Sequence, residues 1–191
     1  MSKGPWKKGV VPIVVDVESD GPLLGVNSMV CFGAVVVNDG VGTKNELSFK
    51  GKTKPLSDEY DPDALAISGY TREEHENFPE IVDTMNEFKE WLDTVCNGRR
   101  PVFWSDNNSY DAAWINYYFL RFVGKNPFGY SSRRIGDLYC GFANSLKANR
   151  EWKRLRKTSH THDPLDDARG NAEALIEIFK QMYRRRESEI Q

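Results

Sequence analysis

The chain has 191 residues and a formal net charge of −2, from 26 basic and 28 acidic side chains. An apolar share of 39% and an aromatic share of 12% exclude a disordered or low-complexity chain, which lacks the side chains needed to build a core. No apolar run reaches the roughly 18 residues that a membrane span requires. Val10–Val15 is also too short for a signal-peptide core, and the three cysteines form no CxxC pair, so we expect a cytoplasmic protein with reduced core thiols.

Charge is distributed unevenly along the chain. Pro55–Asp93 contains twelve acidic and two basic residues, whereas Lys147–Lys157 contains six basic residues and one acidic residue. The second segment would attract a polyanion, although a solvated helix face has the same composition. Charge alone therefore leaves open whether the protein binds nucleic acid.

The first fifty residues predict an antiparallel meander of three strands. Pro12–Val17 is a β-branched apolar run, Ser28–Val37 is a second one rich in Val, and Glu46–Lys50 is a shorter third candidate. Gly21–Gly25 and Asn38–Gly42 supply the Gly, Pro and Asn residues that are typical of the intervening turns.

Helices and one further strand follow. Apolar residues spaced three and four apart predict a helix over about 79–97, then a short strand at Pro101–Trp104 and a helix over 109–123. We expect another helix at Asp137–Leu146, and the apolar stripe of Leu165–Met182 predicts a long last helix. This order favours an α/β fold in which helices pack on the faces of one mixed sheet.

Asp16 and Glu18 lie at the end of the first predicted strand. Residues two apart in a strand point to the same face, so the two carboxylates would repel each other. A divalent cation between them would relieve the repulsion, but an exposed strand end would also tolerate both charges.

Two more acidic clusters lie where predicted helices begin. Asp111 follows a strand-to-helix corner, a position at which α/β folds commonly carry functional residues. His162 precedes the last helix, and Asp167 lies in its first turn beside Asp163 and Asp166. Helix capping explains one or two of these acids, whereas a histidine beside a carboxylate also suits a general base.

Taken together, these clusters resemble the DEDDh branch of the DnaQ-like 3′-5′ exonucleases, the superfamily that includes RNase T and oligoribonuclease. The D-x-E motif appears in Asp16–Gly21, the N-x-x-[FY]-D motif as Asn107–Asp111, and the H-x-x-x-x-D-A motif as His162–Ala168. The resemblance extends over about residues 12–182. The chain departs from the commoner family pattern at Ser19, Asp20, Asp106 and Pro164.

The resemblance implies a ribonuclease H-like fold, with a mixed five-stranded sheet flanked by helices, in a single exonuclease domain over residues 1–191. It implies hydrolysis of RNA or single-stranded DNA from the 3′ end, release of nucleoside 5′-monophosphates, two Mg²⁺ or Mn²⁺ ions and a homodimer. In the family pattern the metal ligands fall on Asp16, Glu18, Asp111 and Asp167, and the general base falls on His162.

The resemblance also suggests where the substrate binds. Ser19, Asp20 and Asn107 are candidates for contact with the terminal nucleotide. In the basic segment, Trp152 and Arg154 are candidates for holding a single strand, with the indole stacking on a base.

The histidines and aromatics outside the motifs carry weaker expectations. His160 lies two residues too early for the motif, so we interpret it as a loop residue or a phosphate contact, and we expect His75 at the surface. Tyr117, Tyr118 and Phe128 are candidates for an exposed dimer interface.

Two other functions remain open at this level. One is a non-catalytic nucleic-acid-binding domain on the same fold, which would not need all five motif residues. The other is a two-metal phosphatase of small nucleotides, which the basic segment disfavours. Specificity for RNA or DNA depends on contacts to the 2′ hydroxyl and has no local sequence signature.

Overall fold

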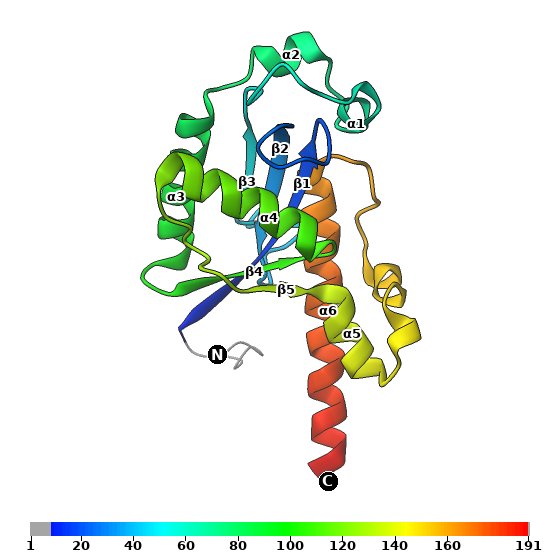
Figure 1. Cartoon of the computed structure of the whole chain (residues 1–191). Coiled ribbons are helices and arrows are strands. Elements are labelled where there is room, and N and C mark those ends of the chain that lie inside the picture. The colour runs from blue at the N-terminus through cyan, green and yellow to red at the C-terminus, as the bar shows by residue number, and fades with distance from the viewer. Residues whose placement is uncertain (1–8, 191) are drawn as a thin grey trace.

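The computed structural model describes residues 9–190. Five strands form one mixed sheet: β1 (Val10–Ser19), β2 (Met29–Val36), β3 (Ser48–Lys52), β4 (Arg100–Ser105) and β5 (Ser132–Arg134). Their order across the sheet is β3-β2-β1-β4-β5 (Figure 1). The pairs β1/β2 and β2/β3 are antiparallel, whereas β1/β4 and β4/β5 are parallel. The predicted mixed five-stranded sheet is confirmed.

Helices cover both faces of this sheet. They are α1 (Pro62–Ile67), α2 (Arg72–Glu76), α3 (Ile81–Cys96), α4 (Asn108–Tyr118), α5 (Ile135–Ala143) and α6 (Pro164–Ile190). A π-helical turn at Phe119–Val123 extends α4, and two 3₁₀ turns, Leu146–Ala148 and Glu151–Leu155, lie between α5 and α6. The long predicted helices are confirmed, whereas the predicted helix at 137–146 begins and ends earlier, as α5.

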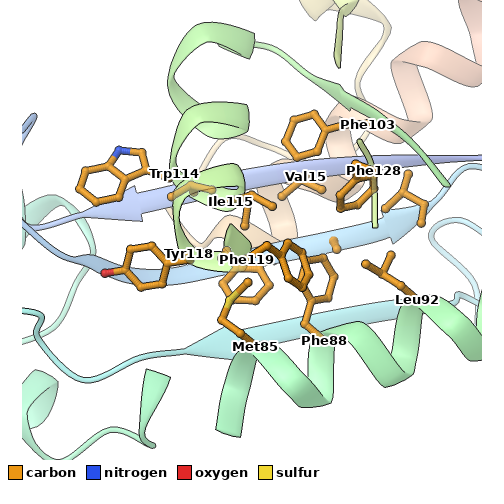
Figure 2. Close-up of a cluster of buried hydrophobic side chains, with 14 of the residues drawn as sticks. Val15, Met85, Phe88, Leu92, Phe103, Trp114, Ile115, Tyr118, Phe119 and Phe128 are labelled. Atoms are coloured by element: carbon orange, nitrogen blue, oxygen red, sulfur yellow. The ribbon is translucent and has the colours of Figure 1, made fainter. Parts of the chain in front are cut away.

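The pleat of β1 divides the core into two layers. Its odd-numbered residues, such as Val15, pack against α3 and α4. Figure 2 shows Met85 and Phe88 of α3 beside Phe119, and the rings of Phe88 and Phe119 stack with centroids 5.5 Å apart. The hydroxyl of Tyr118 accepts a hydrogen bond from the backbone N–H of Met29 at 2.7 Å.

The other face of β1 packs against α5 and α6. Val14 belongs to this second layer, together with the buried α6 residues Ala168, Ala172 and Leu175. Because side chains alternate along a strand, Asp16 has the same orientation as Val14. The fold therefore directs the carboxylates of β1 towards the helix that carries the third motif.

Some expectations about exposure are wrong. Tyr118 and Phe128 are buried in the core. His75 is fully buried rather than at the surface, because its ring packs against Phe78 and its Nδ1 lies 3.7 Å from Oδ2 of the buried Asp20. The three cysteines are buried and free, as expected. Within residues 9–190, no helix combines the length and the apolar character needed to cross a membrane.

Gly33 allows α6 to begin directly against the sheet. It lies opposite Asp16 in the β1/β2 ladder. A Cβ atom at this position would overlap the backbone of Pro164 and Leu165, in the first turn of α6. The short distance between the carboxylates of β1 and of α6 therefore depends on the absence of a Cβ atom at Gly33.

We predict that Gly33→Ala destabilises the fold by about 1–3 kcal/mol, the usual cost of overpacking a core. Gly141 of α5 is the matched control, because a Cβ there meets nothing within 4 Å. Gly141→Ala is expected to leave the melting temperature unchanged or to raise it, since Ala favours helix more than Gly. Equal melting temperatures for the two variants would contradict the close approach of α6.

Candidate active site

Three segments bring carboxylates together at the carboxyl end of β1. Asp16 and Glu18 come from β1, and the buried Asp167 comes from the first turn of α6. Carboxylate oxygens of these three residues lie within 4.8 Å of one another. Asp111, from the first turn of α4, joins them, since its Oδ1 accepts a hydrogen bond from the N–H of Val17 at 3.2 Å.

Burial and nearby negative charges raise the pKa values of three of these carboxyls, those of Asp16, Glu18 and Asp111. Burial and the charges of Asp111, Asp167 and Glu18 hold the pKa of Asp16 well above its usual range. Burial, reinforced by the charge of Asp167, raises the pKa of Glu18 to about 7. The pKa of Asp111 rises to about 8, mainly because of burial. Without a compensating cation, four ionised carboxylates are unfavourable in this arrangement.

The donor set fits hard divalent cations. All four side chains offer oxygen ligands, which Mg²⁺ and Mn²⁺ prefer. Within the part of the chain that the structure describes, Oδ2 of Asp111 is buried and has no hydrogen-bond partner. A bound cation would satisfy that oxygen and offset the repulsion of the cluster. Asp16, Glu18, Asp111 and Asp167 are therefore the residues that would hold the metal.

His162 lies in the loop that leads into α6, beside this cluster. Its backbone is left-handed, with φ of 62°, and its N–H donates to Oδ2 of Asp167 at 3.1 Å. Residues other than glycine seldom adopt this backbone conformation, so the loop depends on its hydrogen bonds to hold it. Its Nδ1 lies 3.8 Å from Oε1 of Glu18, and about half of the side chain is exposed. An imidazole in this place can reach a water molecule held at the carboxylates.

His160 is closer to the carboxylates than the sequence predicted. Its Nδ1 lies 2.7 Å from Oδ2 of Asp167, and its ring packs edge-on against that of His162, with centroids 4.3 Å apart. It is a neighbour of the carboxylate cluster in space, not only a residue of the adjoining loop. The i, i+2 spacing of the two histidines is the only signal in the sequence of this proximity.

The loop before α6 is fastened to the helix by side chains. Arg156 donates from Nη2 to the backbone oxygen of Asp167 at 2.9 Å. Glu173, two turns along the helix, accepts from the N–H groups of Lys157 and Thr158, both at 2.8 Å. These bonds fix residues 156–162 against α6, so that the histidines keep their place relative to the carboxylates.

Two of the predicted substrate contacts point into the protein. The hydroxyl of Ser19 donates to the backbone oxygen of Gly21 at 2.6 Å, and it also contacts the hydroxyl of Tyr110. Asp20 is fully buried, and its Oδ2 lies 3.3 Å from Nη1 of Arg72. Neither side chain is exposed enough to contact a nucleotide in this structure. They stabilise the end of β1 instead.

The basic segment contains one buried and one exposed candidate. Trp152 is fully buried, and its Nε1 donates to the backbone oxygen of Asn149 at 3.0 Å, so it offers no ring face to a base. The 3₁₀ turn places it in the core against α5 and α6. Arg154 remains 66% exposed, and Asn107 lies exposed at the start of α4. These two candidates are on the accessible surface.

The stability of the metal-free protein is predicted to fall as the pH rises. Asp16, Glu18 and Asp111 bind protons more tightly in the folded than in the unfolded chain, so their contribution to stability is greatest at acidic pH and declines as the pH rises through about 7–8. Asp16→Asn removes one charge, so in excess chelator its melting temperature should exceed that of the wild type at high pH but not at pH 5. Asp39→Asn, at an exposed turn, is the control. An Asp16→Asn protein that is less stable at both pH values would contradict this account.

Comparisons with known proteins agree with this geometry. Residues 13–175 match the model of the RNase T family, described as exonuclease. The chain is 35% identical over 175 residues to the 3′-5′ DNA exonuclease Cap18 of Escherichia coli, a match that covers 88% of this chain and 91% of that protein.

Two solved structures show the same fold at low identity. The nuclease domain of 3′hExo, a DEDDh family member bound to rAMP, has a TM-score of 0.72 at 14% identity, covering 90% of this chain and 92% of that one. E. coli exonuclease I in complex with a dT13 oligonucleotide has a TM-score of 0.67 at 16% identity, covering 94% of this chain and 43% of that one. The chain therefore belongs to the RNase T exonuclease family, and it is a 3′-5′ exonuclease with a ribonuclease H-like fold.

Proposed function

We propose that the protein is a metal-dependent exonuclease that removes nucleoside 5′-monophosphates from the 3′ end of single-stranded DNA. The observation that carries this proposal is the convergence of four carboxylates and His162 at the end of β1. The choice of DNA is supported by the relative that is 35% identical over most of its length, since that protein is a DNA exonuclease.

Two Mg²⁺ or Mn²⁺ ions fit the arrangement of the carboxylates. Asp16 is grouped with Glu18 and Asp167, with carboxylate oxygens within 4.8 Å of one another, and it directly precedes Val17, whose N–H donates to Asp111. It is therefore the natural ligand to share between two ions. When bound, such ions polarise the scissile phosphate and make a bound water more acidic.

His162 is the proposed general base. Its ring is accessible and lies on the side of Glu18, where an attacking water would be held. A neutral imidazole can accept the proton of that water as its oxygen attacks the phosphorus. The bond to the 3′ oxygen of the preceding nucleotide then breaks, and the terminal nucleotide leaves with its 5′ phosphate. The hydrogen bond from the N–H of His162 to Asp167 keeps the imidazole in reach.

The substrate strand is proposed to approach across the start of α4 and the basic 3₁₀ turn. Arg154 and Asn107 are exposed there, and Lys153 pairs with Asp106 at 2.5 Å, which joins the two segments. Basic side chains in this position would contact the phosphates of a single strand.

The homodimer, the cytoplasmic location and a single domain over residues 1–191 stay predictions. Of the three candidates for the dimer interface, Tyr118 and Phe128 are buried and Tyr117 is partly exposed.

Incubation with 5′-labelled oligonucleotides tests the proposal directly. Purified protein with Mg²⁺ should shorten single-stranded DNA progressively from the 3′ end, faster than RNA of the same sequence, and excess chelator should abolish the reaction. Faster shortening of RNA would overturn the choice of substrate. Binding without cleavage would favour the nucleic-acid-binding alternative, and release of inorganic phosphate from mononucleotides would favour the phosphatase.

Two neighbouring aspartates of α6 provide a matched test of the metal ligands. Asp167→Asn is predicted to lower the turnover by several orders of magnitude while the fold persists, because a buried ligand charge is lost. Asp166→Asn should retain most activity, since Asp166 pairs with Arg169 and is partly exposed. Near wild-type turnover of Asp167→Asn, measured on the same substrate, would show that the third motif is misassigned.

His162→Ala is predicted to separate proton transfer from metal binding. Loss of a general base typically lowers the rate ~10²–10⁴-fold, so residual turnover should be measurable. Hydroxide replaces the base at high pH, so the variant should recover part of its deficit there. A variant that also loses Mg²⁺ or Mn²⁺ binding in calorimetry would assign His162 a different role.

A further inference from the structure

A second group of side chains with the donor atoms to hold a metal ion lies beside the carboxylates, and it contains nitrogen. Donor atoms of His160, His162 and Asp167 lie within 4.8 Å of one another. The two rings pack edge-on, and Nδ1 of His160 lies 2.7 Å from Oδ2 of Asp167. This set shares Asp167 with the group formed by Asp16 and Glu18. The chain therefore presents two overlapping donor sets that differ in chemistry.

The chemistry of the second set favours a borderline transition metal over Mg²⁺. Imidazole nitrogen is a preferred ligand of Zn²⁺, whereas Mg²⁺ takes oxygen ligands in nearly ideal octahedral geometry. Two histidines and one carboxylate make three protein ligands, the number that Zn²⁺ commonly takes when it retains a water molecule. The side chains of His160 and His162 are 55% and 52% exposed, so an ion can reach them from solvent.

The shared carboxylate is held in place before any ion binds. The N–H groups of Thr161 and His162 donate to the two oxygens of Asp167, at 3.3 and 3.1 Å. Arg156 bonds to the backbone oxygen of the same residue at 2.9 Å. Such outer contacts orient a ligand and contribute to metal affinity. The set of three ligands therefore requires only small movements of two exposed rings to close on an ion.

We propose that His160, His162 and Asp167 form a Zn²⁺ site, and that an ion bound there switches off the exonuclease. The inhibitory consequence rests on the proposed function, in which His162 accepts a proton and Asp167 holds a catalytic ion. Zn²⁺ coordinated by both would remove the base and one ligand at once. His160 is the specific element, because it belongs to this site and not to the four-carboxylate cluster.

Zinc binding is measured first, without reference to activity. Protein freed of transition metals is placed in millimolar Mg²⁺ and titrated with ZnCl₂ in competition with a fluorescent zinc indicator. The wild type should bind one Zn²⁺ per chain, and His160→Ala should bind it at least tenfold more weakly. Ser159→Ala, one residue away at the surface, is the matched control and should bind as the wild type does. Equal affinities of the wild type and His160→Ala would overturn the proposal.

Inhibition is then measured with labelled DNA in saturating Mg²⁺, as the ratio of rates with and without Zn²⁺ for each variant. The zinc concentration that halves the rate should rise at least tenfold in His160→Ala. An unchanged concentration would overturn the inhibitory role, because zinc would then act at the four carboxylates. If the wild type cleaves no substrate yet binds Zn²⁺ through His160, the proposed function fails while the metal site stands.

Discussion

The repulsion among four carboxylates at the end of β1 is the constraint around which the rest of the structure is arranged. The raised pKa values of Asp16, Glu18 and Asp111 indicate that holding these groups ionised in the folded chain costs free energy. That cost is offset elsewhere, by two apolar layers on opposite faces of the sheet. The parallel pair β1/β4 directs the chain into α4 beside the site, and Gly33 lets α6 begin against β2. The same strands and helices therefore stabilise the fold through their apolar faces and carry the carboxylates at their ends.

The last helix shows this division most clearly. Its alanine and leucine stripe fills the second apolar layer, while its first turn carries Asp167 to the carboxylates. The preceding loop adopts an uncommon backbone at His162, and it is held by Asp167 and Glu173 of the helix itself. A histidine on a loop can therefore be as well placed as a residue on a helix. The same fastening also brings His160 next to Asp167, which gives this chain its nitrogen-containing donor set.

Periodicity predicted the elements that are long enough to show it. Helices α3, α4 and α6 each carry apolar residues spaced three and four apart, and the first two strands were predicted from their β-branched apolar runs, whereas α1, α2 and β5 are too short to show either signal. The motifs identified the four carboxylates and His162, because their spacing relative to strand and helix ends is a local property. The exposure of a side chain, by contrast, depends on tertiary packing and not on its neighbours in the sequence. Trp152 and Asp20 lie in polar segments, yet Trp152 is buried against α6 and Asp20 is buried beside Arg72. The contact of His160 with Asp167 depends likewise on how the loop turns back.

The central claim is that the carboxylates are assembled to hold divalent cations. It is tested most directly by crystals of the protein grown or soaked in Mn²⁺, with anomalous diffraction used to locate the ions. The account predicts an anomalous peak within bonding distance of Asp16 and of at least one carboxylate from Glu18, Asp111 and Asp167. An active protein whose crystals show no ion bound to Asp16 would contradict it.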